Sequence, residues 1–383
     1  MTRVGTRRVL YAIGLNPSLK FGSLEEQIFL IARAFKEQGG LFLPLFQSPL
    51  RPEAQDMYQA AALEAGWLNL EAFDFPTLRR LMRLIHRHKI ELLHWNFYPP
   101  LSMYVWFLKI LMPRLRYYLT DHNSRDLPIS PPVRGLKRSL KKALLKRYYS
   151  KVICISDFVL ECLKSDGIWP NLCCHTYFIN TERFRRDDVV RSCLRKELEV
   201  GGQFVVLVVA QLISAKGVDV ALKAVNRLPQ PVVAWIVGDG PEGGRLRELC
   251  KELSLETRVR FFGYQVDVSP YMQAADCLVC PSVWAEAAGL VILEGLASGL
   301  PVIASAVGGI LQFVDDGRTG FLFAAGDDAQ LADRIRRFNG DPEACKRMGL
   351  EARAVAVERF SPGKRLGEYL ELYRAPAHGG KDG

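Results

Sequence analysis

Short apolar runs alternate along the chain with segments in which apolar residues recur at helical spacing. A continuous apolar run is typical of a strand buried on both faces, and strands that alternate with helices build parallel sheets. The runs predict strands near residues 7–15, 40–47, 90–97, 116–123, 151–157, 204–212, 232–240, 258–264, 275–282, 300–305 and 320–323. The pattern restarts after a charged stretch near residue 186, so we predict an α/β protein of two doubly wound, Rossmann-like domains. We place them at residues 1–190 and 191–360.

Ligands of doubly wound sheets lie at the carboxyl ends of the strands, so candidate residues are sought there. Ser23 and Glu26 have the spacing of a capping box and predict a helix start. The amides of Gly22 and Ser23 at that start favour a phosphate, although every strand-to-helix turn has this geometry. Lys216 follows the first strand of the second half, where a lysine is either solvated or anchors a phosphate.

The histidines and cysteines give few signs of a metal site. His94 and His122 end two strands of the first half, so each is either a hydrogen-bonded structural residue or faces a ligand. Cys277 and Cys280 form a CxxC inside an apolar run, without a second such pair nearby. The nine cysteines are an odd, scattered set and are interpreted as reduced, buried apolar residues of a cytoplasmic protein. We expect no metal and no cofactor.

The sequence GDGPEG at 238–243 matches the dinucleotide-binding pattern GxGxxG, directly after a predicted strand. That pattern needs an acidic residue at the end of the next strand to hold a ribose. The next strand ends instead in Gly263, Tyr264 and Gln265. A tight strand-to-helix turn is therefore favoured over an NAD site.

Glu286 and Glu294 flank a short apolar segment, EAAGLVILE, whose second part has helical spacing. Amides at that helix start, near Gly289 and Leu290, suit a phosphate, and carboxylates accept hydrogen bonds from sugar hydroxyls. A sugar nucleotide would use all of them. Two surface glutamates on an amphipathic helix explain the spacing equally well.

Charge is uneven along the chain. Residues 1–190 hold 28 Lys and Arg against 17 Asp and Glu, which accounts for the whole net charge of +10. Residues 134–151 contain eight of these cations and no acid. Such a segment is either a solvated helix face or a contact for an anionic membrane surface, and it lacks a motif for nucleic acid. The opening residues are interpreted as a first strand rather than a signal peptide.

The second half strongly resembles the retaining GT-B glycosyltransferases of family 4, also called group 1. The resemblance rests on EAAGLVILE within residues 275–323, on VGDGPEGGRLREL and on ERFSPGKRLGEYLELY. It is looser over residues 1–190, where FGSLEEQ, ELLHWN and YYLTDHN fit in order. It implies transfer of a sugar from a nucleotide-diphosphate sugar to a glycan or lipid-linked acceptor, in cell-envelope or exopolysaccharide biosynthesis. It also implies a last helix, near 362–374, that returns to the first domain before a disordered tail.

The resemblance also implies roles for individual residues. Glu294 would bind the ribose, and Glu286 the transferred sugar. Lys216 and the amides of Gly289, Leu290, Gly22 and Ser23 would hold the diphosphate. His122 would lie near the transferred sugar, and Gly263 and Tyr264 near the base.

One departure concerns Gln211, which stands where the family usually carries an arginine. Arginine grips a diphosphate through two parallel hydrogen bonds and a permanent charge, and glutamine does neither. This keeps open the alternative of a non-catalytic, sugar-nucleotide-binding partner subunit of a glycosyltransferase.

Overall fold

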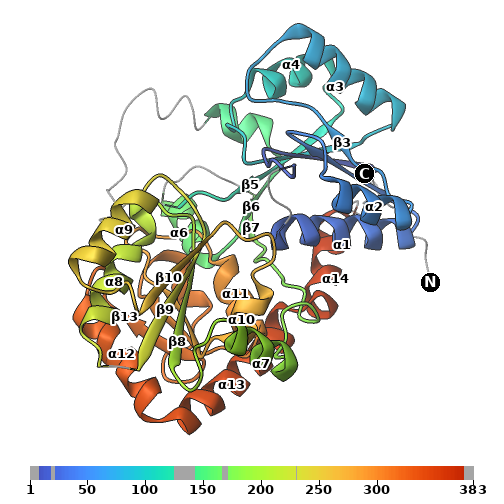
Figure 1. Cartoon of the computed structure of the whole chain (residues 1–383). Coiled ribbons are helices and arrows are strands. Elements are labelled where there is room, and N and C mark those ends of the chain that lie inside the picture. The colour runs from blue at the N-terminus through green and yellow to red at the C-terminus, as the bar shows by residue number, and fades with distance from the viewer. Residues whose placement is uncertain (1–7, 19–21, 125–142, 166–170, 230, 375–383) are drawn as a thin grey trace, which may run out of the picture. The chain divides into compact units, whose positions relative to one another are not determined.

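The computed structural model describes residues 8–18, 22–124, 143–165, 171–229 and 231–374. Contacts divide these residues into two units (Figure 1). Unit 1 contains the described parts of residues 1–122, 131–177 and 363–383, and unit 2 contains those of 123–130 and 178–362. The predicted disordered tail at 375–383 and half of the basic segment, residues 134–142, lie outside the described residues.

Unit 1 is built around a parallel sheet in the order β3-β2-β1-β4-β5-β6-β7. Its strands are β1 (Arg8–Ile13), β2 (Leu41–Phe46), β3 (Gly66–Trp67), β4 (Leu92–Asn96), β5 (Arg116–Asp121), β6 (Lys151–Cys154) and β7 (Leu172–Cys174). Its helices are α1 (Ser23–Glu37), α2 (Pro52–Ala60), α3 (Phe75–Arg87), α4 (Met103–Leu111), α6 (Asp157–Ser165) and most of α14 (Pro362–Leu372).

Unit 2 repeats this plan with a parallel sheet in the order β10-β9-β8-β11-β12-β13. The strands are β8 (Phe204–Val209), β9 (Val232–Val237), β10 (Val259–Gly263), β11 (Cys277–Cys280), β12 (Val302–Ser305) and β13 (Gly320–Phe323). The helices are α7 (Asp188–Glu197), α8 (Val218–Asn226), α9 (Gly243–Glu252), α10 (Ser269–Ala274), α11 (Leu290–Ala297), α12 (Asp328–Gly340) and α13 (Pro342–Phe360), with 3-10 turns η1 (Ser214–Lys216) and η2 (Gly308–Gln312).

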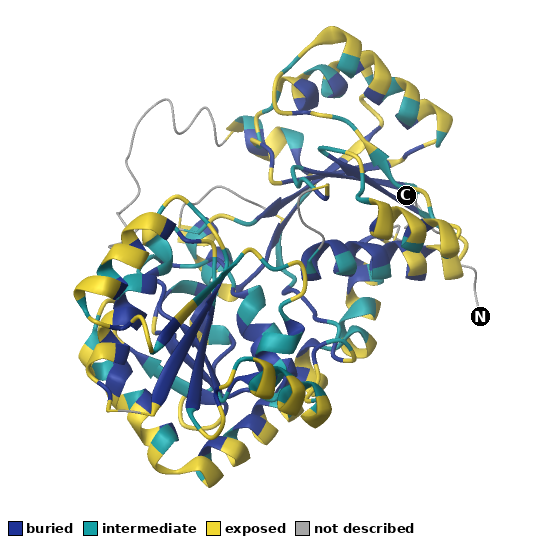
Figure 2. Cartoon of the chain, viewed as in Figure 1, coloured by how far each residue is buried: buried dark blue, intermediate teal, exposed yellow. Residues whose placement is uncertain are grey.

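These two sheets confirm the predicted doubly wound α/β architecture. The central strands of both sheets are buried, while the outer faces of the covering helices are exposed (Figure 2). Strand order reverses between β1 and β4 in unit 1 and between β8 and β11 in unit 2. Loops that leave neighbouring strands in opposite directions open a crevice at such a point. Two short strands, β3 and β7, were not predicted, because neither forms an apolar run of its own.

The end of the chain completes the core of unit 1. Tyr373 is buried, and its hydroxyl lies 2.6 Å from Nδ1 of His94, in the middle of the sheet. The other ring nitrogen of His94 lies 2.7 Å from Oγ1 of Thr120 on β5. Burial holds the pKa of His94 well below its usual value. His94 is therefore a structural residue with both nitrogens occupied, which supports the first of its two alternatives and not the ligand-facing one.

The free cysteines of the described chain include the predicted CxxC pair. Cys277 and Cys280 are both buried in β11, and burial raises the pKa of each thiol. In the part of the chain that the structure describes, no three His, Cys, Asp or Glu side chains gather in a way that suits a metal ion. Over the same residues, no helix is long and apolar enough to cross a membrane.

Candidate functional site

The centre of the candidate site in unit 2 is an ion pair between two residues 70 positions apart. Nζ of Lys216 donates to Oε1 of Glu286 at 2.6 Å, and the hydroxyl of the buried Ser282 donates to the same oxygen. The Lys216 side chain is 25% exposed and the Glu286 side chain is 12% exposed, so water reaches the ion pair only in part. Burying either charge alone would be costly, and the pairing offsets that cost.

Glycines bring the two loops of this ion pair together. Gly217 has φ of +61°, and a side chain there would overlap the carbonyl oxygen of Pro281. The amide of Val283 donates to the carbonyl of Ala215 at 2.9 Å. The loop after β8 is thereby fixed against the loop after β11. Lys216 consequently meets Glu286 at the point where the strand order reverses.

Two further glycines support Glu286 from the other side. The amide of Gly309 donates to the carbonyl of Glu286 at 2.7 Å. Gly308 has φ of +54°, and a Cβ there would overlap the same carbonyl group. The η2 turn therefore sets the backbone position of Glu286.

The ion pair leaves donors and acceptors unused. Among the described residues, Oε2 of Glu286 accepts no hydrogen bond, and Nζ of Lys216 donates only to Glu286. Gly289 is the N-cap of α11, and within the same described ranges neither its amide nor that of Leu290 has an acceptor. The site thus contains a cation, two backbone amides and a carboxylate oxygen with unused hydrogen-bonding capacity, of which the Gly289 amide belongs to a buried residue.

Glu294 lies in α11, half-buried. Its charge acts on Cys280, as do those of Glu286 and Lys216: burial raises the pKa of this thiol, Glu286 and Glu294 raise it further, and Lys216 lowers it. The three charged groups therefore surround one buried sulfur atom at the end of β11. Both glutamates and Lys216 thus act on the same thiol, and their roles in binding a donor stay predictions.

The remaining predicted residues of unit 2 lie along the same edge of the sheet. Gln211 follows β8 and is exposed. Gly263 ends β10 with φ of +66°, and its carbonyl accepts from the amide of Gly238 at 2.7 Å. Tyr264 follows it and is 46% exposed. A flat aromatic ring with this exposure can stack on another ring.

The GxGxxG pattern has a structural explanation. A side chain at Gly238 would overlap the backbone of Ala210, and one at Gly240 would overlap that of Leu212. Both glycines let the turn after β9 approach the loop that carries Gln211. The favoured interpretation, a tight strand-to-helix turn, accounts for these two residues without a dinucleotide.

The predicted residues of unit 1 lie at the carboxyl edge of its own sheet. Helix α1 begins at Ser23 with Gly22 as its N-cap. The buried carboxylate of Glu25 accepts from the Gly22 amide at 2.9 Å. The capping interaction thus starts one residue earlier than the predicted pair of Ser23 and Glu26, because Gly22 takes the extended cap conformation. The Gly22 amide already has an anionic partner within unit 1.

His122 follows β5 and has both ring nitrogens occupied. The amide nitrogen of Asn96 donates to the carbonyls of Ala12 and His94, which leaves its oxygen as an acceptor for Nε2 of His122 at 3.3 Å. Nδ1 therefore accepts from the hydroxyl of Tyr177 at 2.5 Å. These two hydrogen bonds fix His122 in the neutral tautomer that carries its proton on Nε2.

Stacking completes the environment of His122. The ring of Phe97 lies parallel to it with centroids 3.8 Å apart, and Phe97 has the unusual φ of +57°. Left-handed backbone in a bulky residue is strained and persists where its surroundings enforce it. Burial lowers the pKa of His122 to about 3. His122 is therefore held as a neutral ring in a fixed orientation.

A pH prediction follows for His122. Its pKa is lower in the folded than in the unfolded chain, so its contribution to stability is complete above about pH 6.5 and is lost as the pH falls toward 3. Replacing His122 with Asn should therefore flatten the decline in unfolding free energy between pH 7 and pH 5, by up to about 2 kcal/mol. Urea titrations at both pH values measure this difference. An unchanged decline would show that the histidine already titrates normally in the folded chain.

Several residues of the site were missed by sequence reasoning. Ser282, Asn96 and Tyr177 hold Glu286 and His122 in place, and Phe97 covers His122. The indole nitrogen of Trp284 is buried without a hydrogen-bond partner, close to Lys216. Asn96, Phe97 and Ser282 stand at the ends of predicted strands, which could have pointed to them, whereas Tyr177 follows the unpredicted strand β7.

Comparisons with known proteins agree with both halves of the chain. The family model of group 1 glycosyl transferases matches residues 191–355, and that of glycosyltransferase family 4 matches residues 26–175. N-acetyl-alpha-D-glucosaminyl L-malate synthase of Bacillus anthracis is 26% identical over 306 residues, which cover 79% of each chain. The lipopolysaccharide core biosynthesis glycosyltransferase LpsE of Rhizobium meliloti is 34% identical over 44% of this chain, and the match spans about half, 49%, of that relative.

Solved structures share the fold over almost the whole chain. HepE of Anabaena, in complex with UDP and glucose, superposes with a TM-score of 0.78 at 21% identity, covering 96% of this chain and 99% of that one. Sucrose-phosphate synthase of Thermosynechococcus elongatus also gives a TM-score of 0.78, at 21% identity. Together with the two family models and the paired parallel sheets, this shows that the chain belongs to the group 1, family 4 glycosyltransferases and has their GT-B fold.

Proposed function

We propose that this glycosyltransferase moves a sugar from a nucleotide-diphosphate sugar to a hydroxyl group of a glycan or lipid-linked acceptor, with retention of configuration and without a metal ion. The observation that carries the proposal is the set of unused groups around the Lys216–Glu286 pair. Cationic and amide donors suit a diphosphate, and the carboxylate oxygen suits sugar hydroxyls.

The names of relatives point in the same direction. HepE was solved with UDP and with UDP-glucose, and the matched Rhizobium meliloti proteins act in lipopolysaccharide core biosynthesis. We therefore assign the chain to cell-envelope or exopolysaccharide biosynthesis, at the cytoplasmic side of the membrane. The transferred group is proposed to be a hexosyl or related residue.

Each site residue then has a proposed role. Lys216 and the amides of Gly289 and Leu290 hold the diphosphate, Glu286 the sugar and Glu294 the ribose. Gly263 and Tyr264 lie beside the base. His122, through its neutral imidazole ring, orients the sugar. The amides of Gly22 and Ser23 in unit 1 are proposed to add to the diphosphate contacts, and Gly22 would first have to release Glu25.

In the proposed reaction, positive charge develops on the sugar and negative charge develops on the departing diphosphate. The bond between the anomeric carbon and the diphosphate oxygen breaks, and the electron pair leaves with the diphosphate. The acceptor hydroxyl attacks from the same face, and its proton passes to an oxygen of the departing phosphate. Lys216 and the helix amides stabilise the negative charge as it grows, which lowers the barrier rather than only tightening binding.

The direct test is a titration of the purified chain with several nucleoside diphosphates, followed by assays of donor hydrolysis and of transfer. Binding with slow hydrolysis supports the enzyme. Binding without any turnover of donor sugars supports the alternative, a non-catalytic partner subunit. Absence of nucleoside diphosphate binding would contradict both.

Gln211 is the observation that keeps the alternative in place. It is exposed after β8, at the edge assigned to the diphosphate, and it carries no charge. Gln211→Arg is expected to tighten nucleoside diphosphate binding about tenfold or more, because a charge-assisted hydrogen bond contributes about 1.5–3 kcal/mol. Calorimetry measures the change. Equal or weaker binding by a folded Q211R variant would place Gln211 away from the phosphates.

A further inference from the structure

Helix α4 carries apolar side chains on the face that it turns to solvent. Met103, Trp106, Ile110 and Leu111 are all exposed, Trp106 by 43% and Ile110 by 58%. Their spacing places them on one side of the helix, with the half-buried Phe107 between them. The other side packs into unit 1 through Tyr104, Val105 and Leu108. Single exposed apolar residues are ordinary on a protein surface, but a continuous helical stripe indicates a binding surface.

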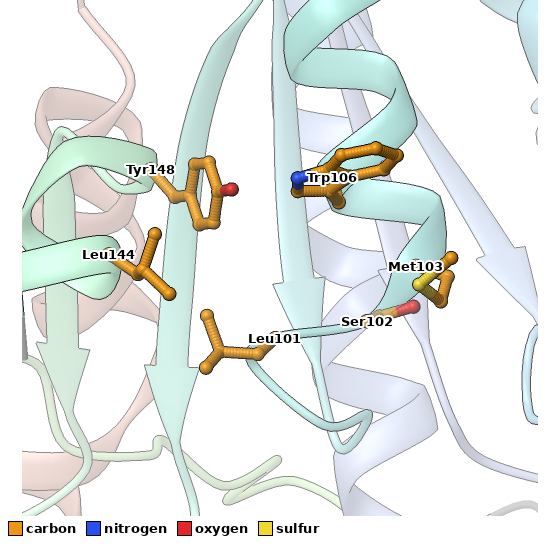
Figure 3. Close-up of a pocket in the computed structure, with 6 residues that line it drawn as sticks. All are labelled: Leu101, Ser102, Met103, Trp106, Leu144 and Tyr148. Atoms are coloured by element: carbon orange, nitrogen blue, oxygen red, sulfur yellow. The ribbon is translucent and has the colours of Figure 1, made fainter. Parts of the chain in front are cut away.

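An apolar groove runs beside this stripe. It has a volume of about 300 Å³ and is lined by Leu101, Ser102, Met103, Trp106, Leu144 and Tyr148. Figure 3 shows the rings of Trp106 and Tyr148 on opposite sides of the groove, with Leu144 on the side of Tyr148 and Leu101 between the two sides. Tryptophan and tyrosine combine an apolar ring with a polar tip, which suits the boundary between water and hydrocarbon.

Cations surround the apolar surface. Lys109 lies on α4, and Arg114 follows it. Lys146 and Arg147 are exposed beside Leu144 and Tyr148. Burial and the charge of Arg147 lower the pKa of Lys109, so these two cations are close enough to repel each other. None of the four forms an ion pair with another described residue. An anionic partner would relieve this repulsion.

Helix α3, which contacts α4, carries further positive charge. It contacts α4 where the rings of Phe75 and Phe107 meet with centroids 5.6 Å apart. Its exposed side carries four arginines and, from Phe75 to Arg87, no acid: Arg79, Arg80, Arg83 and Arg87. None of these arginines forms an ion pair with a described residue, although Arg80 is close enough to Asp74 to help lower the pKa of that carboxyl group. Two copies of this chain would bring like charges together here, so a second copy does not fit the surface.

We propose that this surface, made of α4, residues 143–148 and the adjoining arginines of α3, binds an anionic phospholipid bilayer. The α4 stripe enters the boundary between headgroups and acyl chains, and the cations contact lipid phosphates. The groove between Trp106 and Tyr148 receives part of an acyl chain. The inference extends the proposed use of a lipid-linked acceptor, but binding at this surface requires neither donor nor transfer.

The test is co-sedimentation of the full chain with vesicles of phosphatidylcholine alone and of phosphatidylcholine mixed with phosphatidylglycerol. Binding is expected only to the mixed vesicles and should fall as salt is added. Ile110→Ser and Trp106→Ser should each weaken that binding about three- to tenfold, since each removes an apolar side chain from the interface. Lys146→Gln together with Arg147→Gln should weaken it by a similar factor.

Matched controls lie elsewhere on the chain. Leu350 is 60% exposed on α13 in unit 2, and Trp67 is 56% exposed on β3. Leu350→Ser and Trp67→Ser should leave vesicle binding unchanged. Bromine-labelled acyl chains should quench part of the tryptophan fluorescence of the wild type, and less of it in the Trp106→Ser variant.

Three outcomes would overturn the inference. One is equal sedimentation of the wild type and the Ile110→Ser variant. A second is vesicle binding that Lys146→Gln with Arg147→Gln weakens but that Ile110→Ser and Trp106→Ser leave unchanged. The third is self-association in sedimentation velocity that Ile110→Ser abolishes, with no binding to vesicles. Nucleoside diphosphate titration of the same variants separates this result from the proposed transfer activity, because the test substitutions lie in unit 1 and the control Leu350→Ser lies on α13, all outside the Lys216–Glu286 site.

Discussion

Lys216→Met is expected to lower the rate of sugar transfer by about 10²–10³-fold, the usual cost of removing one preorganised donor from a developing anion. Methionine keeps most of the length of the side chain but removes its charge, so the departing diphosphate loses its nearest cation. The same change leaves Glu286 as an unpaired, mostly buried carboxylate. Steady-state kinetics with a donor that the wild type turns over give the change in kcat and in kcat/KM.

The partner substitution should act differently on binding and on turnover. Glu286→Gln releases Lys216 from its ion pair and leaves an unbalanced positive charge at the site. A nucleoside diphosphate should therefore bind at least as tightly as to the wild type, while transfer is lost because the sugar has no carboxylate acceptor. Glu294→Ala should instead weaken nucleoside diphosphate binding about tenfold or more, through the loss of a charge-assisted hydrogen bond to ribose.

A matched pair on α8 controls for the removal of a lysine. Nζ of Lys223 contacts Asp219 at 3.1 Å on the surface of the same helix that begins beside Lys216. Lys223→Met removes an ion pair of ordinary surface strength, about 0–1 kcal/mol, and should leave transfer unchanged. Transfer by Lys216→Met within twofold of the wild type would place the diphosphate elsewhere.

Gly217→Ala is expected to destabilise unit 2 by about 2–5 kcal/mol and to reduce transfer with it. A left-handed residue with a Cβ costs about 1–2 kcal/mol, and an overpacked contact costs about 1–3 kcal/mol. The new methyl group would overlap the carbonyl oxygen of Pro281, so the loop that holds Lys216 must move away from Glu286. Thermal and urea unfolding give the loss of stability.

Gly317 separates the two causes. It also has a left-handed backbone, with φ of +77°, but nothing lies within 4 Å of the place that its Cβ would take. Gly317→Ala should show the conformational cost alone and should leave transfer intact at temperatures where the variant is folded. Equal losses of stability in the Gly217→Ala and Gly317→Ala variants would mean that the contact with Pro281 adds no cost of its own.

The sequence alone was sufficient for the architecture because buried parallel strands are continuous apolar runs. The position of Lys216, Glu286 and Gly289 at the carboxyl edge of the second sheet was also predictable, since each follows an apolar run. The short strands β3 and β7 left no such signal. The cap of α1 was misplaced by one residue because Ser23 and Glu26 fit the same spacing as Gly22 and Glu25.

Pairings across the fold were not predictable from the sequence. Lys216 and Glu286 meet only because two loops approach through Gly217, and nothing in their spacing records this. The tautomer of His122 depends on the orientation of Asn96, which in turn depends on two backbone carbonyls. The apolar stripe of α4 is equally hidden, since its sequence is apolar on every side and only packing decides which side stays exposed.

The anchoring of Tyr373 in the core of unit 1 has a consequence for how the protein is made. The ribosome delivers β1 to β7 before unit 2, but Tyr373, whose hydroxyl lies against His94, and helix α14, whose Tyr369 meets Gln27, emerge only after unit 2. Unit 2 can therefore fold while unit 1, although begun earlier, waits with an open core for residues 363–374.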